Sequence, residues 1–572
     1  MVTHMVGWQV GPSKCLIDEG VDYLVIGSGF GGSVAAATLA EKVDDETSVC
    51  LFERGKAYPP GSFPRTWNGL NESFWDPPYR NGMFQMWSFT GIDAITASGL
   101  GGGSLIYANV MLEKPETWFT QPNPDGSGAE CWSFRHADLA EYYQQVRDFL
   151  KVEELPDELR TCSPKTARFL EALPDAQLAP LAVRFSATKG NPQAGVPLPA
   201  EDYANIHGDV QRTTCQMCGE CDFGCNVGAK NTMDHTYLSK AAADGAEICV
   251  QTEVREIHSC NDGKDHLFHV GYIVHRDEPD AQDQPDPPLQ WIRAKRVVLA
   301  AGTLNTTLLM LRNRGNLNIS CDEPIGTRFC GNGDLLGFAL PGFWSRGLLP
   351  SRGPVITSFN QNEEGGHRIL LQDGGAPNLR SWKLTRKEAR DLIVKLGREW
   401  IERILRPRPG LQPTAEERSW WPRWRWPLPI LGMGADTPDG RLTLNESDCT
   451  LECDWTIDSS QPHFEEVRQR MESLSQRLTT RFLNPRWMDR VITVHPLGGC
   501  PADTTAEKGV VDSYGRVHSV PGLWIADGSV MPGPIGANPS LTIAAFARRA
   551  ACKLLEEGLE TPSTPEPFIR TD

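Results

Sequence analysis

The N-terminal region alternates short apolar runs with a glycine turn, in a pattern that predicts a parallel sheet. Residues 23–26 form a β-branched apolar run typical of a strand, and residues 33–40 are small and apolar, as expected of a buried helix. A second apolar run at residues 48–53 lies at the distance expected for the next parallel strand, reached by a right-handed crossover. We therefore expect a βαβ unit at the start of the chain.

Helix and strand patterns also recur far along the chain. Apolar residues at helical spacing predict amphipathic helices at residues 139–150 and 464–478. Residues 296–302 predict a buried strand that leads into a helix near Thr303, and residues 539–555 predict a C-terminal helix. The chain is therefore expected to leave the first sheet and return to it.

This order predicts an α/β fold in which a Rossmann-type domain is interleaved with an α+β substrate-binding domain. Its segments are expected at 20–120, 206–320 and 486–558 for the Rossmann-type domain, 121–205 and 321–485 for the substrate domain, and 559–572 for a disordered tail.

The charge balance narrows the class of partner. The 572 residues include 56 Lys+Arg and 73 Asp+Glu, for a formal net charge of -17. We expect no nucleic-acid partner, because phosphate binding needs a basic surface. The first 20 residues lack a secretory pattern, and no apolar run reaches the length of about 18 residues that spans a membrane. A cytoplasmic protein is therefore expected.

Three glycines follow the first predicted strand in the spacing G-x-G-x-x-G. In a dinucleotide site Gly27 would make the tight turn, Gly29 would admit the pyrophosphate, and Gly32 would let helix and strand pack closely. Glu53 closes the second strand, where a carboxylate binds ribose hydroxyls. A glycine-rich loop in an unrelated α/β protein is the alternative, but strand, turn, helix and acid together favour a dinucleotide.

Several motifs in this order resemble the glucose-methanol-choline oxidoreductases, and most closely the bacterial cholesterol oxidase group. The motifs lie at residues 27–32 with Glu53, 99–109, 300–303, 494–499, 527–529 and 536–540. The resemblance spans nearly the whole chain. It implies that the Rossmann-type domain binds FAD and that the protein oxidises an alcohol by passing a hydride to the flavin N5.

The resemblance also implies two catalytic residues, His495 and Asn538. A histidine can take the hydroxyl proton while the carbon delivers hydride, and an amide can hold the same oxygen. A histidine that only makes structural hydrogen bonds is the plainer interpretation. Asn538 and Pro539 also read as the N-cap and first residue of the C-terminal helix, whose N-terminus would stabilise negative charge on the flavin.

The remaining cofactor contacts follow from the same resemblance. Backbone amides of the glycine run would approach the flavin and its phosphates, Val254 would lie beside the adenine, and Asp527 would lie near the ribityl and phosphate groups. Each could instead serve loop or strand packing. The predicted contacts of this group are Gly102, Gly103, Ser104, Asn109, Val254, Asp527 and Pro539.

Four of the sixteen cysteines form a C-x2-C-x2-C-x3-C run: Cys215, Cys218, Cys221 and Cys225. This spacing supplies thiolates to iron-sulfur clusters in bacterial ferredoxins. The proline that follows the last ferredoxin cysteine is absent here, since Asn226 takes its place, and no second run exists. An iron-sulfur cluster, a zinc site and structural cysteines all remain open.

Two stretches bear on the substrate. Steroid oxidases of this group that also shift a double bond use a glutamate, whereas residues 371–382 offer Asp373 and no matched glutamate. Isomerase activity is therefore in doubt. Residues 420–426 contain four tryptophans among arginines, which suits either peripheral membrane contact or aromatic packing between domains.

The sequence thus predicts an FAD-dependent oxidase or dehydrogenase of a hydrophobic alcohol, with a sterol 3-hydroxyl as the expected group. Molecular oxygen is the expected acceptor without a cluster, and a protein or quinone partner with one. The alternatives are a dehydrogenase of another alcohol or sugar that uses the cluster, an NAD-linked dehydrogenase, and an electron-transfer or redox-sensing protein whose working site is the cysteine run.

Overall fold

The computed structural model describes residues 7–44, 46–66, 69–70, 72–75, 81–123, 127–260, 267–275, 287–319, 324–341, 348–363, 368–378, 427–483 and 491–559. The tryptophan-rich residues 420–426 lie outside this set, as does the predicted tail except for Leu559.

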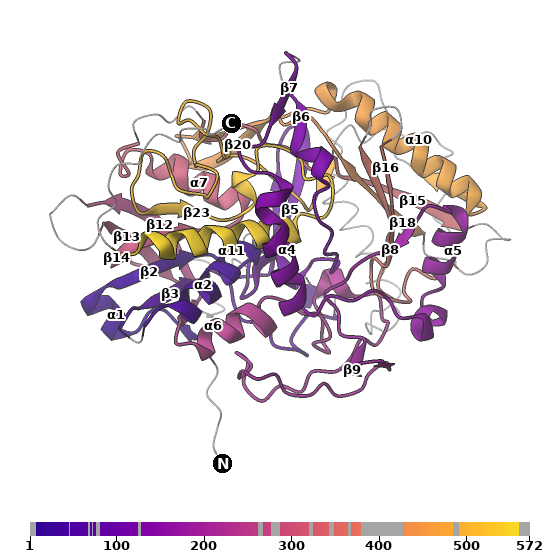
Figure 1. Cartoon of the computed structure of the whole chain (residues 1–572), viewed down its shortest axis with the longest axis horizontal. Coiled ribbons are helices and arrows are strands. Elements are labelled where there is room, and N and C mark those ends of the chain that lie inside the picture. Colours follow the sequence, from indigo (N-terminus) through magenta and orange to yellow (C-terminus); the bar gives the residue numbers. More distant parts are fainter. Residues whose placement is uncertain are drawn as a thin grey trace.

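An eight-stranded sheet forms the first of two lobes (Figure 1). Its order is β1 (Gln9–Val10), β11 (Glu247–Val250), β3 (Val49–Phe52), β2 (Val21–Ile26), β14 (Gln290–Leu299), β13 (Phe268–Val274) and β12 (Thr252–Ser259), with β23 (Leu523–Ile525) also paired to β14. The C-terminal half of β14 pairs in parallel with both β2 and β23, while its N-terminal half pairs antiparallel with β13. The expected βαβ unit is confirmed by β2, helix α2 (Phe30–Lys42) and β3.

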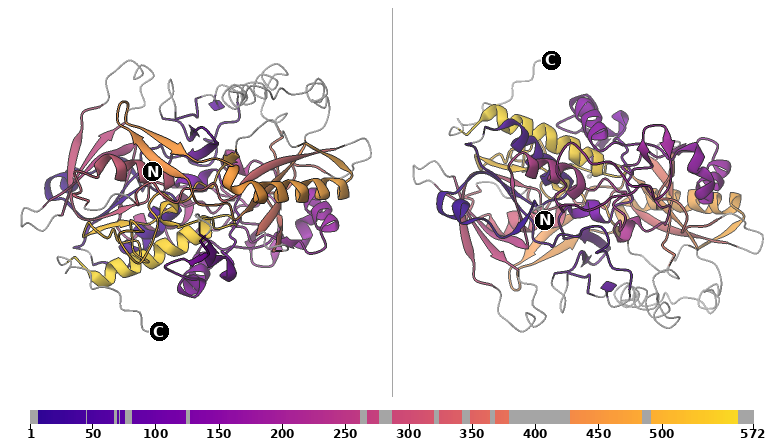
Figure 2. Two further views of the ribbon diagram at one scale, coloured as in Figure 1. Left: turned by 90° about the horizontal axis from the view of Figure 1, so that it is seen from above. Right: turned by 90° about the horizontal axis from the view of Figure 1, so that it is seen from below.

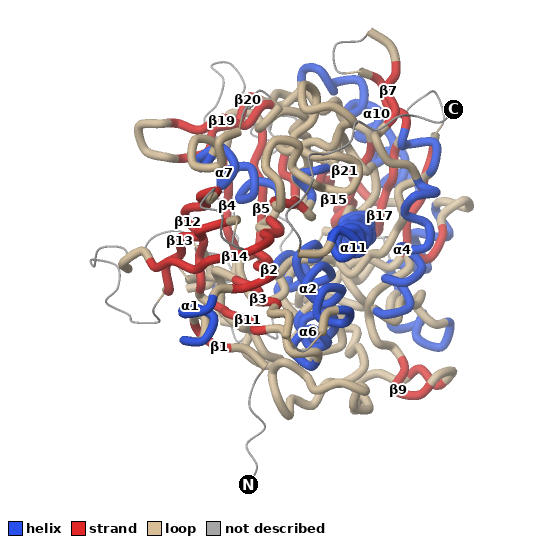
Figure 3. Tube along the Cα trace, turned by 60° about the vertical axis from the view of Figure 1, so that its left-hand side comes forward, coloured by secondary structure: helices blue, strands red, loops and turns tan. Residues whose placement is uncertain are grey.

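Helices pack on this sheet and on one another. Helix α2 packs against α11 (Ser540–Glu557), and α11 packs in turn against α4 (His136–Phe149), as Figure 3 shows for α2 and α11. The small residues of α2 are nearly all buried because they allow this close approach. Helix α7 (Thr303–Asn313) begins directly after β14, as the sequence predicts.

An antiparallel sheet forms the second lobe. It runs in the order β21 (Thr480–Leu483), β15 (Leu335–Pro341), β18 (Leu428–Gly434), β17 (Ile369–Asp373), β16 (Ser358–Asn362) and β8 (Gln177–Leu178). Helix α10 (Gln461–Arg477) lies along its outer side with α5 (Pro164–Ala172) at the far end of the molecule, as Figure 2 shows. This lobe has its own apolar core, to which α10 contributes Val467, Met471 and Leu474.

A small sheet connects the lobes. Its central strand β5 (Ile92–Ala97) pairs with β4 (Phe84–Ser88) on one side and with β22 (Val491–Thr493), which leads to His495, on the other. The shorter elements are α1 (Lys14–Glu19), α6 (Ser239–Ala243), and the hairpins β6 (Thr120–Pro122) with β7 (Ala129–Cys131), β9 (Ser186–Thr188) with β10 (Asn191–Pro192), and β19 (Arg441–Asn445) with β20 (Thr450–Asp454). No helix in the described ranges is both long and apolar enough to cross a bilayer.

Candidate functional site

A cavity of about 1020 Å³ lies between the two lobes and collects most of the predicted site residues. Its walls come from the glycine turn after β2, the glycine-rich segment after β5, strands β4, β15 and β18, and the segments before α7 and α11. The predicted site residues that line it are His495, Asn538, Gly27, Gly29, Glu53, Gly102, Gly103, Val254, Asp527 and Pro539. Gly32, Ser104, Asn109 and the four cysteines lie outside its lining.

The glycine turn has two kinds of position. At Gly27 and Gly32 an added Cβ would lie 2.3 Å from the carbonyl oxygen of Ala300 and 1.9 Å from that of Gly27, so both glycines are required by packing. At Gly29 an added Cβ would meet nothing within 4 Å. The turn therefore exposes its backbone to the cavity at Gly29, at the start of α2, where a helix N-terminus favours an anion.

Glu53 lies at the end of β3 and is almost fully engaged by the protein. Its Oε2 accepts hydrogen bonds from the backbone and hydroxyl of Ser28, and its Oε1 accepts from the backbone of Gly55 and Gly99. A carboxylate offers about four acceptor positions. A ribose hydroxyl at Glu53 would therefore have to replace or share one of these donors, and the Ser28 hydroxyl is the one that can rotate away.

The glycine-rich segment after β5 passes close to the turn. An added Cβ at Gly102 would lie 2.6 Å from the Cα of Gly29, whereas Gly103 faces open space. Ser104 is buried, and its hydroxyl donates to the Gly101 carbonyl and accepts from the Met233 amide. The side chain of Ser104 is thus used inside the protein, and its backbone amide also donates to the Gly101 carbonyl.

The side chain of Asn109, unlike that of Ser104, forms no hydrogen bond within the protein. It is fully buried with a positive φ of 72°, and neither its Nδ2 nor its Oδ1 has a hydrogen-bond partner. Its neighbours Ala108 and Val110 line the cavity. A buried amide with both ends unsatisfied is costly, and it fits a site completed by a polar cofactor such as FAD.

Asp527 braces the start of α7. Its Oδ2 accepts from the Gly302 amide and the Thr306 hydroxyl, and its Oδ1 accepts from the amide and hydroxyl of Ser529. Burial raises the pKa of the Asp527 carboxyl. Asp527 therefore holds Gly302 beside the cavity, while Val254 of β12 contributes an apolar, buried contact to the lining.

His495 is held by a carboxylate. Its Nδ1 lies 2.9 Å from Oδ1 of Asp334, and Oδ2 of the same residue accepts from the Thr493 hydroxyl and the Val494 amide. A carboxylate only accepts hydrogen bonds, so Nδ1 carries the proton in the neutral imidazole. The lone pair is therefore on Nε2, in a residue that lines the cavity.

Asn538 is oriented by a side chain from the other lobe. Its Oδ1 accepts a hydrogen bond of 2.7 Å from Nε2 of Gln372, which lies on β17 and is fully buried. The Nδ2 group of Asn538 is left as a donor. The expectation that Asn538 caps α11 is wrong: Pro539 is the capping residue and no side chain caps the helix, because the Asn538 amide is bonded to Gln372 instead.

One tight turn before β15, residues 331–334, supports both candidate catalytic groups. Asn332 accepts from the Gly536 amide and donates to the Ala537 carbonyl, which fixes the backbone just before Asn538. Asp334 holds His495. Below the turn, Asp436 accepts from the Gly331 amide, and burial raises the pKa of its carboxyl to about 7.

The cysteine run lies beside the cavity. Cys215 is buried, Cys218 is exposed, and Cys221 and Cys225 are partly buried. No three of these four sulfurs lie within 4.8 Å of one another, so the arrangement is not that of a single tetrahedral ion, whose sulfur ligands lie about 3.8 Å apart. The short helical turn Cys221–Phe223 brings the run into contact with the cavity through Asp222 and Phe223.

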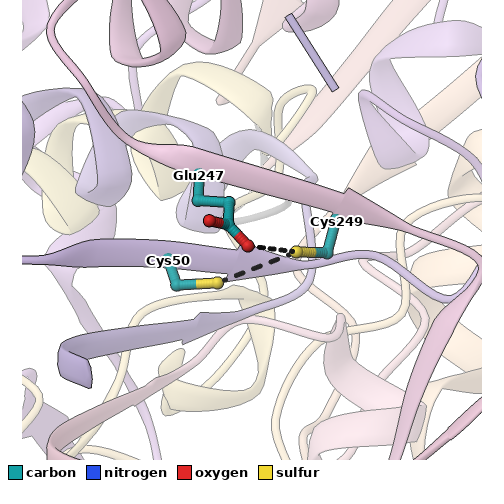
Figure 4. Close-up of side chains that lie close together, drawn as sticks. All are labelled: Cys50, Glu247 and Cys249. Carbon is teal, nitrogen blue, oxygen red and sulfur yellow. Dashed lines mark hydrogen bonds between the residues drawn. The ribbon is translucent and has the colours of Figure 1, made fainter. Parts of the chain in front are cut away.

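A different cysteine pair lies on two neighbouring strands near the β1 edge of the large sheet (Figure 4). The sulfurs of Cys50 on β3 and Cys249 on β11 are 3.9 Å apart, and Glu247 contacts Cys249. Glu247 also accepts from the Gln9 side chain and the Ser13 amide. Burial keeps the pKa of Cys50 well above its usual value, so this cluster attaches the N-terminal segment to the sheet as packed thiols.

Asp373 has no access to the cavity. It forms a 2.6 Å ion pair with Lys165 on α5, and both side chains are 0% exposed. Thr357 donates to the same carboxylate through its amide and its hydroxyl. The one acid that the sequence offers in place of a steroid isomerase base is therefore sealed inside the second lobe.

Sequence reasoning missed Asp334, Gln372 and Asn332. Asn332 stands in Gly331-Asn-Gly-Asp334, whose Asn-Gly pair signals a turn. Nothing local indicates that this turn meets residues 495 and 538, which are more than 150 positions away along the chain.

Comparison with known proteins agrees with this geometry. The family models for GMC oxidoreductase match residues 21–328 and 436–547, and the first alone covers more than half of the chain. A cholesterol oxidase of Mycobacterium tuberculosis is 27% identical over 96% of this chain and 94% of its own length. Paromamine 6'-oxidase of Streptomyces fradiae is 25% identical over 96% of this chain and 93% of its own length. Formate oxidase of Aspergillus oryzae, solved in a study of FAD modification, shares the fold with a TM-score of 0.56 at 12% identity, covering 94% of this chain and 98% of that one.

The predicted fold and family are thus confirmed, and the exposed glycine turn and the unsatisfied Asn109 fit FAD. The chain belongs to the GMC oxidoreductase family and is an FAD-dependent oxidoreductase that acts on CH–OH groups.

Proposed function

We propose that this protein oxidises a hydrophobic alcohol, with a sterol 3-hydroxyl as the reacting group, and that His495 and Asn538 are its catalytic pair. One observation carries the proposal. Asp334 fixes Nδ1 of His495 and Gln372 fixes Oδ1 of Asn538, so that a basic Nε2 and a donor Nδ2 belong to residues of the same cavity.

These two groups have the polarity that an alcohol needs. The hydroxyl hydrogen would be donated to Nε2 of His495, while Nδ2 of Asn538 would donate to the hydroxyl oxygen. Bound FAD supplies the hydride acceptor for the carbon. As the C–H hydride leaves, His495 takes the O–H proton, and Asp334 stabilises the resulting imidazolium.

The cofactor contacts belong to the same proposal. The phosphates would lie against Gly29, the adenosine against Glu53 and Val254, and the flavin ring against residues 102–109, with Asn109 at its edge. The N-terminus of α11 at Pro539 would face the flavin pyrimidine. Asp527 would contribute through the backbone that it braces, since its own oxygens are engaged.

The cavity walls favour an apolar substrate over a polyhydroxylated one. Strands β4, β5, β15 and β18 present mainly aliphatic and aromatic side chains: Phe84, Met86, Ile95, Leu335, Leu336, Phe338 and Leu431. Burial of such surface favours binding by about 25 cal/mol per Å². This supports a substrate like that of the cholesterol oxidases rather than an aminoglycoside such as paromamine. Asp373, the acid that residues 371–382 offer, is sealed in its ion pair with Lys165 and cannot reach a substrate in the cavity, so we propose oxidation without isomerisation.

Anaerobic mixing with alcohols tests the proposal. Cholesterol, a long-chain 1-alkanol and paromamine would each be added to the flavin-loaded protein while its visible absorbance is followed. We expect the sterol to bleach the flavin and paromamine to leave it oxidised. Bleaching by paromamine alone would contradict the hydrophobic assignment, and His495→Gln serves as a control that keeps the flavin but reacts slowly.

Molecular oxygen is the proposed electron acceptor, as for the oxidases among the relatives. An iron-sulfur cluster at Cys215, Cys218, Cys221 and Cys225 is a second candidate, favoured by the contact of Asp222 and Phe223 with the cavity. Iron and sulfide analysis of anaerobically purified protein, together with electron paramagnetic resonance, decides between them. Rapid reoxidation by air with no iron supports oxygen, and stoichiometric iron supports a relay to another acceptor.

A further inference from the structure

Among the described residues, six carboxyl groups line the cavity, and the protein forms hydrogen bonds with five of them. Glu53, Asp93, Glu253, Asp334 and Asp527 accept from Ser28, Ser88, His275, His495 and Thr306, respectively. The sixth is Asp222. Within the described ranges no donor forms a hydrogen bond with its carboxylate.

Asp222 lies beside apolar side chains, where a carboxylate without a hydrogen-bond donor from the protein is unusual. It lies in the turn Cys221–Phe223, deep in the protein, yet it retains partial exposure and lines the cavity. The adjacent Phe223 ring faces Phe84 of β4 at 6.1 Å, so the local wall is otherwise apolar.

The nearest cation does not satisfy this carboxylate. Lys230 is buried and attracts Asp222 electrostatically, but its ammonium donates to three backbone carbonyls, those of Leu105, Tyr107 and Cys221. An ammonium has three protons, and all three are used. Lys230 thus lies near Asp222 without donating a hydrogen bond to its carboxylate.

A polar group of a molecule bound in the cavity can supply the hydrogen bond that the protein does not give to Asp222. Under the proposed function that molecule is FAD or the alcohol. Asp222 lies near the segment 102–109, against which the flavin ring is placed, because Lys230 bonds the carbonyls of Cys221, Leu105 and Tyr107. The polar edge of that ring is assigned instead to the start of α11, at Asn538 and Pro539. The substrate is therefore the better source of the donor.

We propose that Asp222 accepts a hydrogen bond from a second polar group of the substrate, a hydroxyl or a protonated amine at a distance from the alcohol that is oxidised. The inference rests on the proposed function and narrows it: the substrate has an apolar body with a donor at each end. His495 and Asn538 receive one end, and Asp222 receives the other.

Three steroids that differ only at one position provide the test. They are a saturated 3β-hydroxysteroid without a second polar group, its 17β-hydroxy derivative and its 17β-amino derivative. The rate and half-saturating concentration of anaerobic flavin bleaching would be measured for the wild type, Asp222→Leu and Asp222→Asn. Asp93→Asn is the matched control, since Asp93 is a cavity carboxylate that already accepts from Ser88.

We expect the wild type to bind both derivatives at least about tenfold more tightly than the parent steroid, the difference of one hydrogen bond to a charged acceptor. Asp222→Leu should remove this preference without changing the maximal bleaching rate. Asp222→Asn keeps an oxygen acceptor but no charge, so it should retain preference for the hydroxyl and lose it for the amine. Asp93→Asn should keep both preferences.

The failure of this inference is separable from that of the proposed function. If no steroid or long-chain alcohol bleaches the flavin, the proposed function is wrong. If the parent steroid reacts but the derivatives bind no better, or if Asp222→Leu keeps the preference, Asp222 does not bind the substrate. Loss of flavin from purified Asp222→Leu and Asp222→Asn would assign the missing donor to FAD instead and would also overturn the inference.

Discussion

The two faces of strand β17 hold neighbouring polar residues with different environments. Gln372 points toward the first lobe and donates to Asn538, a residue of the cavity wall. Asp373, the next residue, points the other way and is locked to Lys165 behind the sheet. Successive side chains of a strand alternate in this way, so one residue separates a group beside the chemistry from a group that only maintains the fold.

Asp334, a second carboxylate of the same lobe, shows the same difference between a residue at the cavity and a residue sealed in the core. Asp334 and Asp373 both lie at ends of strands in the second sheet and each pairs with a basic side chain. The Lys165–Asp373 pair is 0% exposed, whereas the His495 side chain retains 13% exposure beside the cavity. Substitutions on the cavity face should therefore change the rate of flavin bleaching, and substitutions on the sealed face should change the free energy of unfolding.

The largest effect on the cavity side is expected for His495→Gln. Removal of the proton acceptor should slow anaerobic flavin bleaching by about 10³-fold, within the range measured for general bases. Flavin content and the unfolding temperature should stay near those of the wild type. A rate within threefold of the wild type would show that another group takes the proton.

On the sealed face, Lys165→Met should reduce the free energy of unfolding by about 3 to 5 kcal/mol, because it leaves the Asp373 charge buried without its partner. The bleaching rate per bound flavin should change less than twofold. Denaturant unfolding measures the first quantity and stopped-flow absorbance the second. A large loss of bleaching rate in folded Lys165→Met protein would show that the sealed face also affects the reaction.

Asp334→Asn should slow bleaching by about 10²-fold with little change in stability. An amide can present its NH2 group to Nδ1 of His495, which favours the wrong tautomer. The half-saturating alcohol concentration should change less than the rate does. If only that concentration changes, Asp334 shapes the cavity and does not position the histidine.

Gln372→Leu should slow bleaching at low alcohol concentration by about tenfold, because it removes one neutral hydrogen bond to Asn538. This effect is smaller than that of Asp334→Asn. Gln372→Glu is the informative companion variant, because a carboxylate cannot donate to Oδ1 of Asn538 and would turn that amide around. Equal activity of the wild type and both variants would show that Gln372 does not orient Asn538 for the reaction.

The smallest effect concerns the pH dependence of stability at Asp436. Burial raises the pKa of this carboxyl to about 7, against 3.8 in an unfolded chain. The folded state therefore holds a proton that the unfolded state has released, and stability falls as pH rises from about 4 through about 7. Asp436→Asn should weaken this pH dependence, so that denaturant unfolding shows it gaining stability relative to the wild type as the pH rises from 4 to 8, with no advantage at pH 4.

The sequence predicts the first lobe better than the second for a physical reason. The glycine turn, α2 and β3 are consecutive, so packing constraints on Gly27 and Gly32 appear as a local pattern. His495 and Asn538 were recognisable only through motifs. Asp334 and Gln372 reach them by sheet register and by contacts between lobes, which leave no periodic signal, and the N-cap predicted at Asn538 failed because a distant glutamine competes for its side chain.

A double-mutant cycle tests whether Asp334 acts through His495. Anaerobic flavin bleaching by a steroid alcohol would be compared in the wild type, Asp334→Asn, His495→Gln and the variant with both changes. The double variant should bleach no more slowly than His495→Gln alone, because without the imidazole the carboxylate has nothing to orient. A loss in the double variant equal to the product of the two single losses would contradict it.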